Sequence, residues 1–506
     1  MIATQHETFQ DFLPGIQPLE KISSLIERSD YYNCAYCHWK TNLHLDKALA
    51  GIDDLDLLVA SDDFPTFNIA LLQEEFREAE SITSKFQQGI YHFLANDAQT
   101  GRLINAHVHT HTMTGDHFIK SWALPFEEML LENTDTISGM PVPTRAAELI
   151  IYVIRSMIKH ASLFDLPLII KSGKSTTAEY DYLTENSNII LAQSLLQKHI
   201  PEIDPETFST AIRLLGTKSS LLDKIRLGYS FKRKLKKYRR YNAFVQTAIT
   251  SYAVLRMSYN RIIHHHKHMT LRNGGSIIAL VGPQATGKST IAAELRKWLG
   301  VELAVTTIHS GKPPRTLMTL LPSLAIPLAR KLMPGKATVL IEKDAIDNDS
   351  RSFPLIFIIR KVMLAWDRRA QLGKAWKNAR NGKIIISDRY PSDLVGAIDG
   401  ATFRDEAIAA EPSPVKRFLM KIERRIYSDI CPPDLVLELT VSTEKAIERN
   451  LRRNKKGPKQ TTDYVKLRHA MKYKPAFYKT PVVSISTDED FDTMMLHIKK
   501  VVWAAL

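Results

Sequence analysis

The chain has 506 residues, 44% of them hydrophobic, and a formal net charge of +14 at pH 7. This length exceeds what one core normally supports, so we expect about three domains, and the basic balance suits anionic partners such as nucleotides, nucleic acid or acidic lipid. Three cysteines cannot form a disulfide framework, no signal peptide is recognisable and no stretch reaches the roughly 20 apolar residues of a membrane span, so we expect a cytoplasmic location.

Apolar patterns divide the chain into three predicted parts. Residues 1–140 mix short strand-like runs with helical segments, whereas residues 141–270 space their apolar residues three and four apart, which predicts a helical connector. Residues 271–506 alternate apolar strands with helical stretches, which predicts an α/β fold with a parallel sheet covered by helices on both faces. The Asn-Gly-Gly at 273–275 predicts a turn or hinge before this last part.

The run DLDLLVA in the first part places Asp54 and Asp56 at alternate positions of a predicted strand. Alternate residues share one face of a strand, and two carboxylates on one face can bind divalent metal. With WKTN at 39–42 slightly upstream, the pattern resembles the nucleotidyltransferase superfamily. The resemblance implies an α+β nucleotidyltransferase-like domain over 1–140, with Asp54 and Asp56 as metal ligands.

Two elements of that superfamily lack a counterpart in this chain. The expected Gly-Ser element near the strand is missing, and no third carboxylate follows on a later strand. The candidate strand, INAHVHTHT, is instead predicted to align on one face the side chains of Asn105, His107, His109 and His111. Three interpretations therefore stay open for this part: nucleotidyl transfer, binding without catalysis, and a merely structural acidic turn.

The middle part ends in a basic run, FKRKLKKYRRYNAF, with Lys or Arg at seven of the nine positions 232–240. Phe231, Leu235 and Tyr238 would give a helix here a narrow apolar side, as in helices that lie on lipid surfaces. A solvated face, a lipid-surface contact and a nucleic-acid patch all stay open, although the sequence contains no recognisable nucleic-acid-binding module. The following HHHKH run at 264–268 is interpreted as a basic linker that could bind metal in vitro.

The most informative stretch is SIIALVGPQATGKST at 276–290, because 282–289 matches the phosphate-loop pattern G-x-x-x-x-G-K-[ST] between a predicted strand and a predicted helix. Backbone N–H groups around Gly287 can cradle the phosphates of ATP, Lys288 can reach the β- and γ-phosphates, and Ser289 can ligate Mg²⁺. The predicted ATP-binding residues here are Gly282, Pro283, Gln284, Ala285, Thr286, Gly287, Lys288, Ser289 and Thr290.

Further charged residues surround the predicted phosphate site. GKIIISDRY places Asp388 and Arg389 at the carboxyl end of a strand, where ligands bind in open α/β sheets. A preceding predicted helix presents Arg368, and STEKAIERNLRRN places Arg449 and Arg453 on a later helix. Asp388 could orient Mg²⁺ or water, or act as a base towards a hydroxyl acceptor.

These motifs resemble thymidylate kinase and its relatives among the nucleoside monophosphate kinases, over roughly residues 276–480. The resemblance implies that Arg368, Asp388 and Arg389 handle the acceptor monophosphate. It also implies that Arg449 and the basic segment after it, including Arg453, close over the ATP donor. Charge supports the same conclusion, because bringing two anions together requires arginines and Mg²⁺ more than it requires a base.

The identity of the acceptor stays open. The family carries an acidic Glu-Pro-Gly-Gly segment that helps to build the acceptor pocket, whereas this chain has TIHSGKPPRTLMTLL, without a carboxylate. A nucleoside monophosphate is the first expectation. The segment also resembles that of kinase-like proteins encoded among bacterial surface-polysaccharide genes, and this resemblance implies a sugar or sugar phosphate as the alternative. A non-catalytic nucleotide-binding regulatory protein is a third, and a homodimer is one further partner arrangement.

Overall fold

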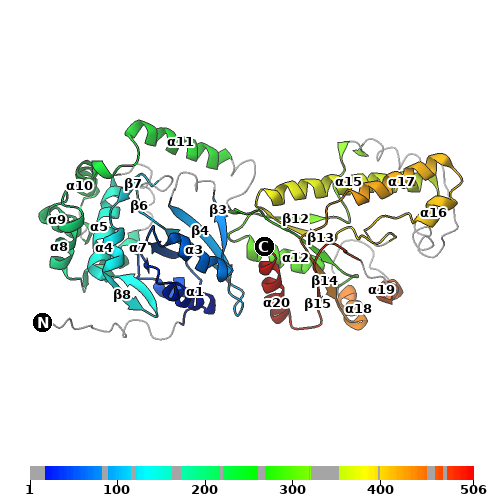
Figure 1. Cartoon of the computed structure of the whole chain (residues 1–506), viewed down its shortest axis with the longest axis horizontal. Coiled ribbons are helices and arrows are strands. Elements are labelled where there is room, and N and C mark those ends of the chain that lie inside the picture. Colours follow the sequence, from blue (N-terminus) through cyan, green and yellow to red (C-terminus); the bar gives the residue numbers. More distant parts are fainter. Residues whose placement is uncertain are drawn as a thin grey trace. The chain divides into compact units, whose positions relative to one another are not determined.

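The computed structural model describes residues 17–81, 89–115, 120–161, 173–185, 187–216, 220–259, 268–317, 319–320, 353–396, 399–452, 462–470 and 476–506. The chain forms two compact units, Met1–Met269 and Thr270–Leu506 (Figure 1). Among the described helices, none combines the length and the apolar character needed to cross a membrane.

The first unit contains a mixed sheet with the strand order β1-β2-β5-β4-β3. Strands β2 and β5 are parallel, whereas β1 with β2, β4 with β5 and β3 with β4 are antiparallel. Two hairpins, β6–β7 and β8–β9, follow. The bounds are α1 (Glu20–Tyr31), β1 (Tyr36–His38), α2 (Leu45–Leu49), β2 (Leu55–Val59), α3 (Phe64–Gln73), β3 (Arg77–Glu80), β4 (Ile90–Asn96), β5 (Leu103–His109), β6 (Thr112–Thr114), β7 (Trp122–Leu124), α4 (Glu127–Glu132), β8 (Thr134–Ile137) and β9 (Met140–Pro143).

Strand β5 is shorter than the sequence pattern predicts. It ends at His109, and one further hydrogen bond, from the N–H of Thr110 to the carbonyl of Gly89, follows in the same register. The chain then enters the separate strand β6, so exposed His111 lies outside the row formed by Asn105, His107 and His109. The predicted four-residue face therefore has three members.

The helices after β9 pack on these strands and complete the first unit. Buried side chains of α5 share one apolar core with Cys37 and Trp39 from the strand region, and with residues of α8, α9 and α10. This burial explains why the stretch 146–154 of α5 is mostly apolar on all sides, which a helix on the surface would not be. The bounds are α5 (Arg145–His160), α7 (Gly173–Glu185), α8 (Ile189–His199), α9 (Pro205–Gly216), α10 (Leu221–Lys234) and α11 (Ala243–Tyr259).

The basic run at 232–240 is not one continuous helix, as the interpretation of an interfacial helix required. Helix α10 ends at Lys234, and a single 3₁₀ turn, Lys236–Tyr238, follows, because Phe231 and Leu235 are buried in the core of the unit. Its cations also have partners inside the unit: Lys234 pairs with Asp204 and Lys237 with Glu202. The contact with a lipid surface stays a prediction, while most of the HHHKH run lies outside the described residues.

The second unit is built on a parallel sheet with the strand order β12-β13-β11-β14-β15, which is the parallel sheet that the sequence predicts. Helices α15 and α17 cover one face, and α12 and α20 the other (Figure 1). The bounds are β10 (Thr270–Leu271), β11 (Ile277–Val281), α12 (Lys288–Leu299), β12 (Val305–His309), α15 (Leu355–Arg380), β13 (Ile384–Asp388), α16 (Asp405–Ala410), α17 (Pro414–Ser428), β14 (Leu435–Thr440), α18 (Thr443–Leu451), α19 (Thr462–Ala470), β15 (Val482–Ser486) and α20 (Phe491–Ala504).

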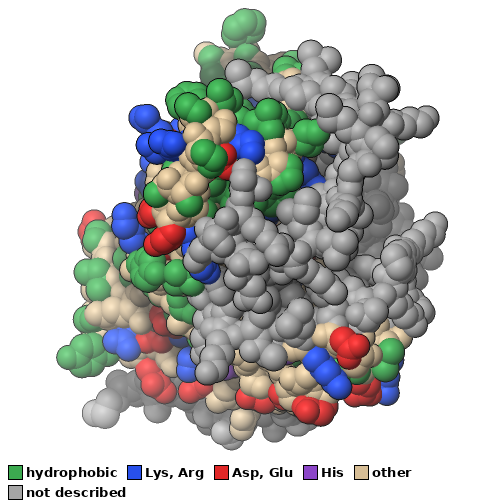
Figure 2. All heavy atoms as spheres, turned by 90° about the vertical axis from the view of Figure 1, so that its right-hand side faces the viewer, with side chains coloured by type: hydrophobic (Ala, Val, Ile, Leu, Met, Phe, Trp, Pro, Cys, Tyr) green, Lys and Arg blue, Asp and Glu red, His purple; other side chains and the backbone are tan. Residues whose placement is uncertain are grey.

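Covering both faces explains why β11 and β13 are apolar without alternation. Ile277, Ala279 and Val281 pack towards Leu372 and other residues of α15, and the intervening residues of β11 are equally buried. The surface is mixed: Figure 2 shows hydrophobic side chains beside both basic and acidic ones on the described part of one face. A central strand buried in this way fixes the position of the loop that follows it.

Candidate functional site

The phosphate loop connects β11 to α12, and its backbone has the conformation that glycine permits. Gly282 has a φ of +138°, and a Cβ added there would lie 2.3 Å from the carbonyl oxygen of Leu439. Gly287 has a φ of +88°, and Ala285 also adopts a positive φ, of 61°. These turns bring the chain round to the N-terminus of α12, where the direction of the backbone N–H groups and the helix dipole favour an anion.

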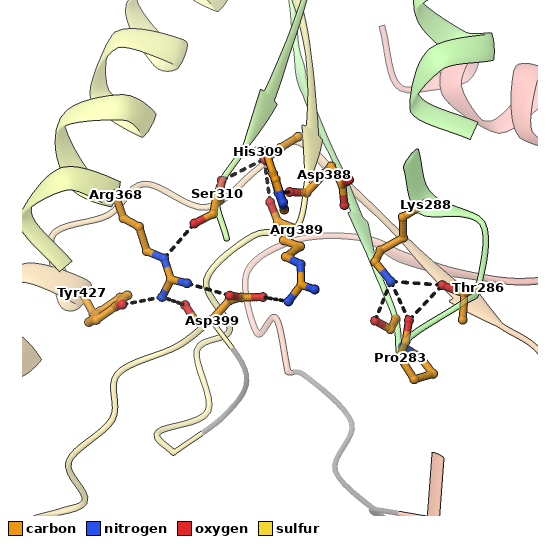
Figure 3. A network of polar contacts seen from close by, with 12 residues as sticks. Pro283, Thr286, Lys288, His309, Ser310, Arg368, Asp388, Arg389, Asp399 and Tyr427 are labelled. Carbon is orange, nitrogen blue, oxygen red and sulfur yellow. Dashed lines mark hydrogen bonds and ion pairs between the residues drawn. The ribbon is translucent and has the colours of Figure 1, made fainter. Parts of the chain in front are cut away.

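Lys288 lies in the first turn of α12 and is 9% exposed. Its ammonium donates to the carbonyl oxygens of Gly282, at 3.0 Å, and Pro283, at 2.5 Å, and to the hydroxyl of Thr286 at 3.2 Å (Figure 3). Neutral oxygens satisfy the ammonium without neutralising its charge. Lys288 is therefore held over the loop as a positive charge that a phosphate can recruit.

Ser289 and Asp388 meet at the ends of two neighbouring elements, although 99 positions separate them in the sequence. The hydroxyl of Ser289 donates to Oδ2 of Asp388 at 2.8 Å. Pairing of β11 with β13, in which Leu280 lies opposite Asp388, places that carboxylate beside the phosphate loop. A hydroxyl and a carboxylate at a water-accessible position fit Mg²⁺, which prefers few protein oxygens together with water and phosphate.

Arg389 follows Asp388 directly and turns its side chain along the same edge of the sheet. Its backbone φ is 78°, an uncommon value for a residue other than glycine, and its N–H donates to the carbonyl of Leu280. The side chain packs on Gly311, where a Cβ would lie 2.8 Å from Cδ of Arg389. Its guanidinium donates to Oδ2 of Asp399 at 3.2 Å, and the side chain is 31% exposed.

Arg368, predicted to handle the acceptor with Arg389, lies in the middle of α15 and is only 5% exposed. Nε donates to the carbonyl of Ser310, Nη1 to the Tyr427 hydroxyl and the Asp399 carbonyl, and Nη2 to Oδ1 of Asp399 (Figure 3). The structure thus joins Arg368 and Arg389 through Asp399. Most N–H groups of Arg368 have protein partners, so in this state Arg389 is the arginine more available to a ligand.

Arg449, on α18, also contacts the phosphate loop. Its guanidinium donates to the side chain and the carbonyl of Thr487, and at 3.5 Å to the carbonyl of Ala285 in the loop. His469, from α19, contacts the carbonyl of Gln284 at 2.9 Å. Sequence analysis did not predict His469, because no motif distinguishes it. Arg453, the other predicted donor-side arginine, lies outside the described residues.

In the first unit, Asp56 lies beside Lys40, with which it forms an ion pair. His107 lies 3.4 Å from Asp56 through Nδ1 and 3.7 Å from Asp54 through Nε2. Burial opposes ionisation of Asp56, but the ammonium of Lys40 holds the pKa of this carboxyl well below its usual range.

Lys40 was not predicted to take part, and its backbone φ of 68° is unusual. Its ammonium supplies a positive charge beside Asp56, where the sequence interpretation placed a metal ion. Among the described residues, no group of three or more His, Cys, Asp or Glu side chains is arranged to hold a metal ion. The metal assignment of Asp54 and Asp56 and the nucleotidyltransferase-like assignment stay predictions.

A buried carboxyl group on α5 accepts hydrogen bonds from the segment that follows Lys40. Glu148, on α5, is 2% exposed, and it accepts hydrogen bonds from the N–H of Asn42, at 2.7 Å, and from its side-chain amide, at 3.2 Å. Burial raises the pKa of Glu148 to about 7, although the two hydrogen bonds act in the opposite direction. The protonation state of Glu148 near neutral pH therefore affects the hydrogen bonds that hold the chain around Asn42.

This coupling predicts a pH dependence of stability. The folded-state pKa of Glu148 lies above its value of 4.5 in an unfolded chain, so the folded state binds the proton more tightly. The free energy of unfolding should therefore fall as pH rises from about 4.5 through about 7, by about 3 kcal/mol in total. Urea unfolding of Glu148→Gln should lack this component, so that the variant gains stability relative to wild type across this range. Glu132→Gln is the control, because it removes an exposed carboxylate whose ion pair with Lys198 lies at the surface, and it should change the free energy of unfolding by less than about 1 kcal/mol.

Comparison with known proteins gives distant structural likenesses. No family model matches the sequence, and no curated protein matches it. A thymidylate kinase from Candida albicans shares 18% identity over 46% of this chain and 92% of its own, with a TM-score of 0.26. Two structures of deoxyadenosine kinase from M. mycoides, one with bound dATP and one with bound dCMP and dCDP, share 19% and 20% identity, cover 45% of this chain and 98% and 99% of their own, and have TM-scores of 0.25. Scores this low carry no functional argument, which must come from the residues of the site.

Proposed function

We propose that the second unit is an ATP-dependent phosphotransferase that moves the γ-phosphoryl group of ATP to a nucleoside monophosphate or a similar phosphorylated acceptor. The observation that carries this proposal is the hydrogen bond between Ser289 of the phosphate loop and Asp388, directly before Arg389. This hydrogen bond connects the phosphate loop to the carboxylate of Asp388, and the partly exposed guanidinium of Arg389 lies at the same edge of the sheet.

Each side chain would have a distinct part in the transfer. The backbone of the loop would bind the β-phosphate, and Lys288 would turn from the loop carbonyls towards the γ-phosphate, where negative charge redistributes during transfer. Arg389 would hold the acceptor phosphate, and Arg449 would act on the donor side of the loop. Ser289 and Asp388 would hold Mg²⁺, which, when bound, neutralises phosphate charge.

The alternative acceptors differ in what they demand of Asp388. A free sugar hydroxyl must lose a proton, so its phosphorylation needs a base within hydrogen-bond reach. Asp388 already accepts a hydrogen bond from Ser289 and sits where Mg²⁺ fits, which suits a metal ligand better than a base. An ionised phosphate acceptor needs no base, so the arrangement favours a phosphorylated acceptor.

A screen of phosphoryl transfer from ATP–Mg²⁺ tests the proposal. The full chain is incubated with nucleoside monophosphates, sugar phosphates and free sugars, and transfer is measured by phosphorus NMR. We expect turnover with at least one phosphorylated acceptor and at least about 100-fold lower kcat/KM with the matching unphosphorylated compound. Turnover only with free sugars would show that the acceptor is a hydroxyl compound and not a phosphorylated one. Tight ATP binding without turnover on any acceptor would favour a regulatory protein.

A further inference from the structure

Asp399 bridges the two guanidinium groups of the acceptor side. Its Oδ1 accepts from Nη2 of Arg368 at 2.6 Å and its Oδ2 accepts from Nη1 of Arg389 at 3.2 Å, so each carboxylate oxygen faces a different arginine (Figure 3). A phosphate monoester that binds two arginines presents its oxygens in the same way. The carboxylate thus has the charge sign, the position and the pattern of accepted hydrogen bonds of an acceptor phosphate.

We propose that Asp399 is an internal substitute for the acceptor phosphate, which a phosphate monoester displaces when it binds. This proposal rests on the proposed phosphotransfer function and adds a residue that selects the class of acceptor. Asp399 holds the two arginines in place while the site contains no ligand, and it competes with every ligand that needs them.

Both arginines can keep their positions when a phosphate replaces the carboxylate of Asp399. Arg368 remains bonded to Ser310 through Nε and to Tyr427 through Nη1 when the Asp399 side chain moves, so its fork stays aimed at the space that the carboxylate leaves. Arg389 is 31% exposed against 11% for Asp399, which gives an incoming anion access from the Arg389 side. The exchange therefore requires movement of one side chain, not of the sheet edge.

Charge determines which ligands can displace Asp399. Two guanidinium groups and one carboxylate carry a net charge of about +1, and replacing the carboxylate with a phosphate dianion brings the group close to neutrality. A free hydroxyl compound would instead leave two neighbouring, poorly solvated cations uncompensated, which is unfavourable. Asp399 would therefore admit phosphorylated acceptors and exclude their unphosphorylated counterparts.

The backbone of Asp399 also distinguishes this residue from an ordinary surface ion pair. Its φ is 67°, in the left-handed region, and its carbonyl oxygen accepts a further hydrogen bond, from Nη1 of Arg368 at 3.1 Å. Aspartate tolerates this conformation better than most residues do, yet it remains uncommon. The backbone bond anchors the residue at the site independently of its carboxylate, which leaves the carboxylate free to exchange.

Binding of methyl phosphate, the simplest phosphate monoester, tests the proposal. It is titrated calorimetrically into the full chain saturated with ADP–Mg²⁺, so that the phosphate loop is occupied. Asp399→Asn keeps the shape of the side chain but removes the competing charge, and should bind methyl phosphate at least about tenfold more tightly than wild type. Asp429→Asn is the matched control, because Asp429 pairs with Arg369 on the same helix α15, and should leave the affinity unchanged. Equal or weaker binding by a folded Asp399→Asn protein overturns the proposal.

A second measurement needs no variant and so remains valid if Asp399→Asn does not fold. In the wild-type chain, carbodiimide labelling of Asp399 is followed by mass spectrometry with and without methyl phosphate. Displacement should raise its labelling severalfold, and labelling that stays constant at saturating methyl phosphate contradicts the exchange. Neither readout depends on turnover, so an inactive chain with these responses would refute the phosphotransferase alone, and an active chain without them would refute the role of Asp399 alone.

Discussion

Replacing Lys288 by alanine is expected to lower kcat for phosphoryl transfer by about two to three orders of magnitude. The ammonium donates hydrogen bonds to three neutral oxygen atoms of the loop, those of Gly282, Pro283 and Thr286. Water can replace it at those oxygens, so we expect thermal unfolding to change little. The loss should fall mainly on kcat, because the charge acts most strongly on the γ-phosphoryl group during transfer.

The control is Lys297→Ala, which removes an exposed lysine from the same helix α12. It should leave both kcat and KM within about twofold of wild type, because exposed surface charges contribute little. Initial-rate kinetics at saturating acceptor compare the two variants. If Lys288→Ala and Lys297→Ala behaved alike, the phosphate loop would not be the site of transfer, and the proposed function would fail with it.

The phosphate loop could be predicted because its chemistry is local. The positive φ at Gly282 and Gly287, the short reach of Lys288 and the start of α12 all depend on residues within one turn of each other. The apolar runs of the second unit also identify their strands, since a parallel sheet covered on both faces requires continuous apolar strands. Because the local sequence pattern and the overall fold agree here, the strands and the phosphate loop can be predicted from the sequence.

Contacts between distant segments could not be predicted in the same way. Asp399 begins the sequence DGATF, which resembles any polar connection, and only folding brings it between Arg368 and Arg389. The role of Lys40 could likewise not be predicted, because its ion pair with Asp56 follows from the antiparallel pairing of β1 with β2. The break of the helix within the basic run at 232–240 was likewise not predictable, because Phe231 and Leu235 pack against residues that are distant in the sequence.

The two arginines that the sequence treats as equivalent should respond differently to substitution. Arg389→Ala should lower kcat/KM for the phosphorylated acceptor about 100-fold with little loss of stability, because a partly exposed guanidinium leaves and a charged hydrogen bond to the ligand is lost. Arg368→Ala should instead lower the free energy of unfolding by about 3 kcal/mol, because it removes the buried partner of Ser310, Tyr427 and Asp399.

Urea unfolding and initial-rate kinetics on both variants separate an arginine whose main effect is on ligand binding from one that also stabilises the folded chain. Arg389→Lys is the conservative control: a point charge replaces a fork, so part of the binding should return but not the paired geometry with Asp399. A destabilised Arg389→Ala protein together with a stable, inactive Arg368→Ala protein would reverse the assignment. The bonds of Arg368 to Ser310 and Tyr427 would then contribute little to folding, and the buried arginine would act mainly through the ligand.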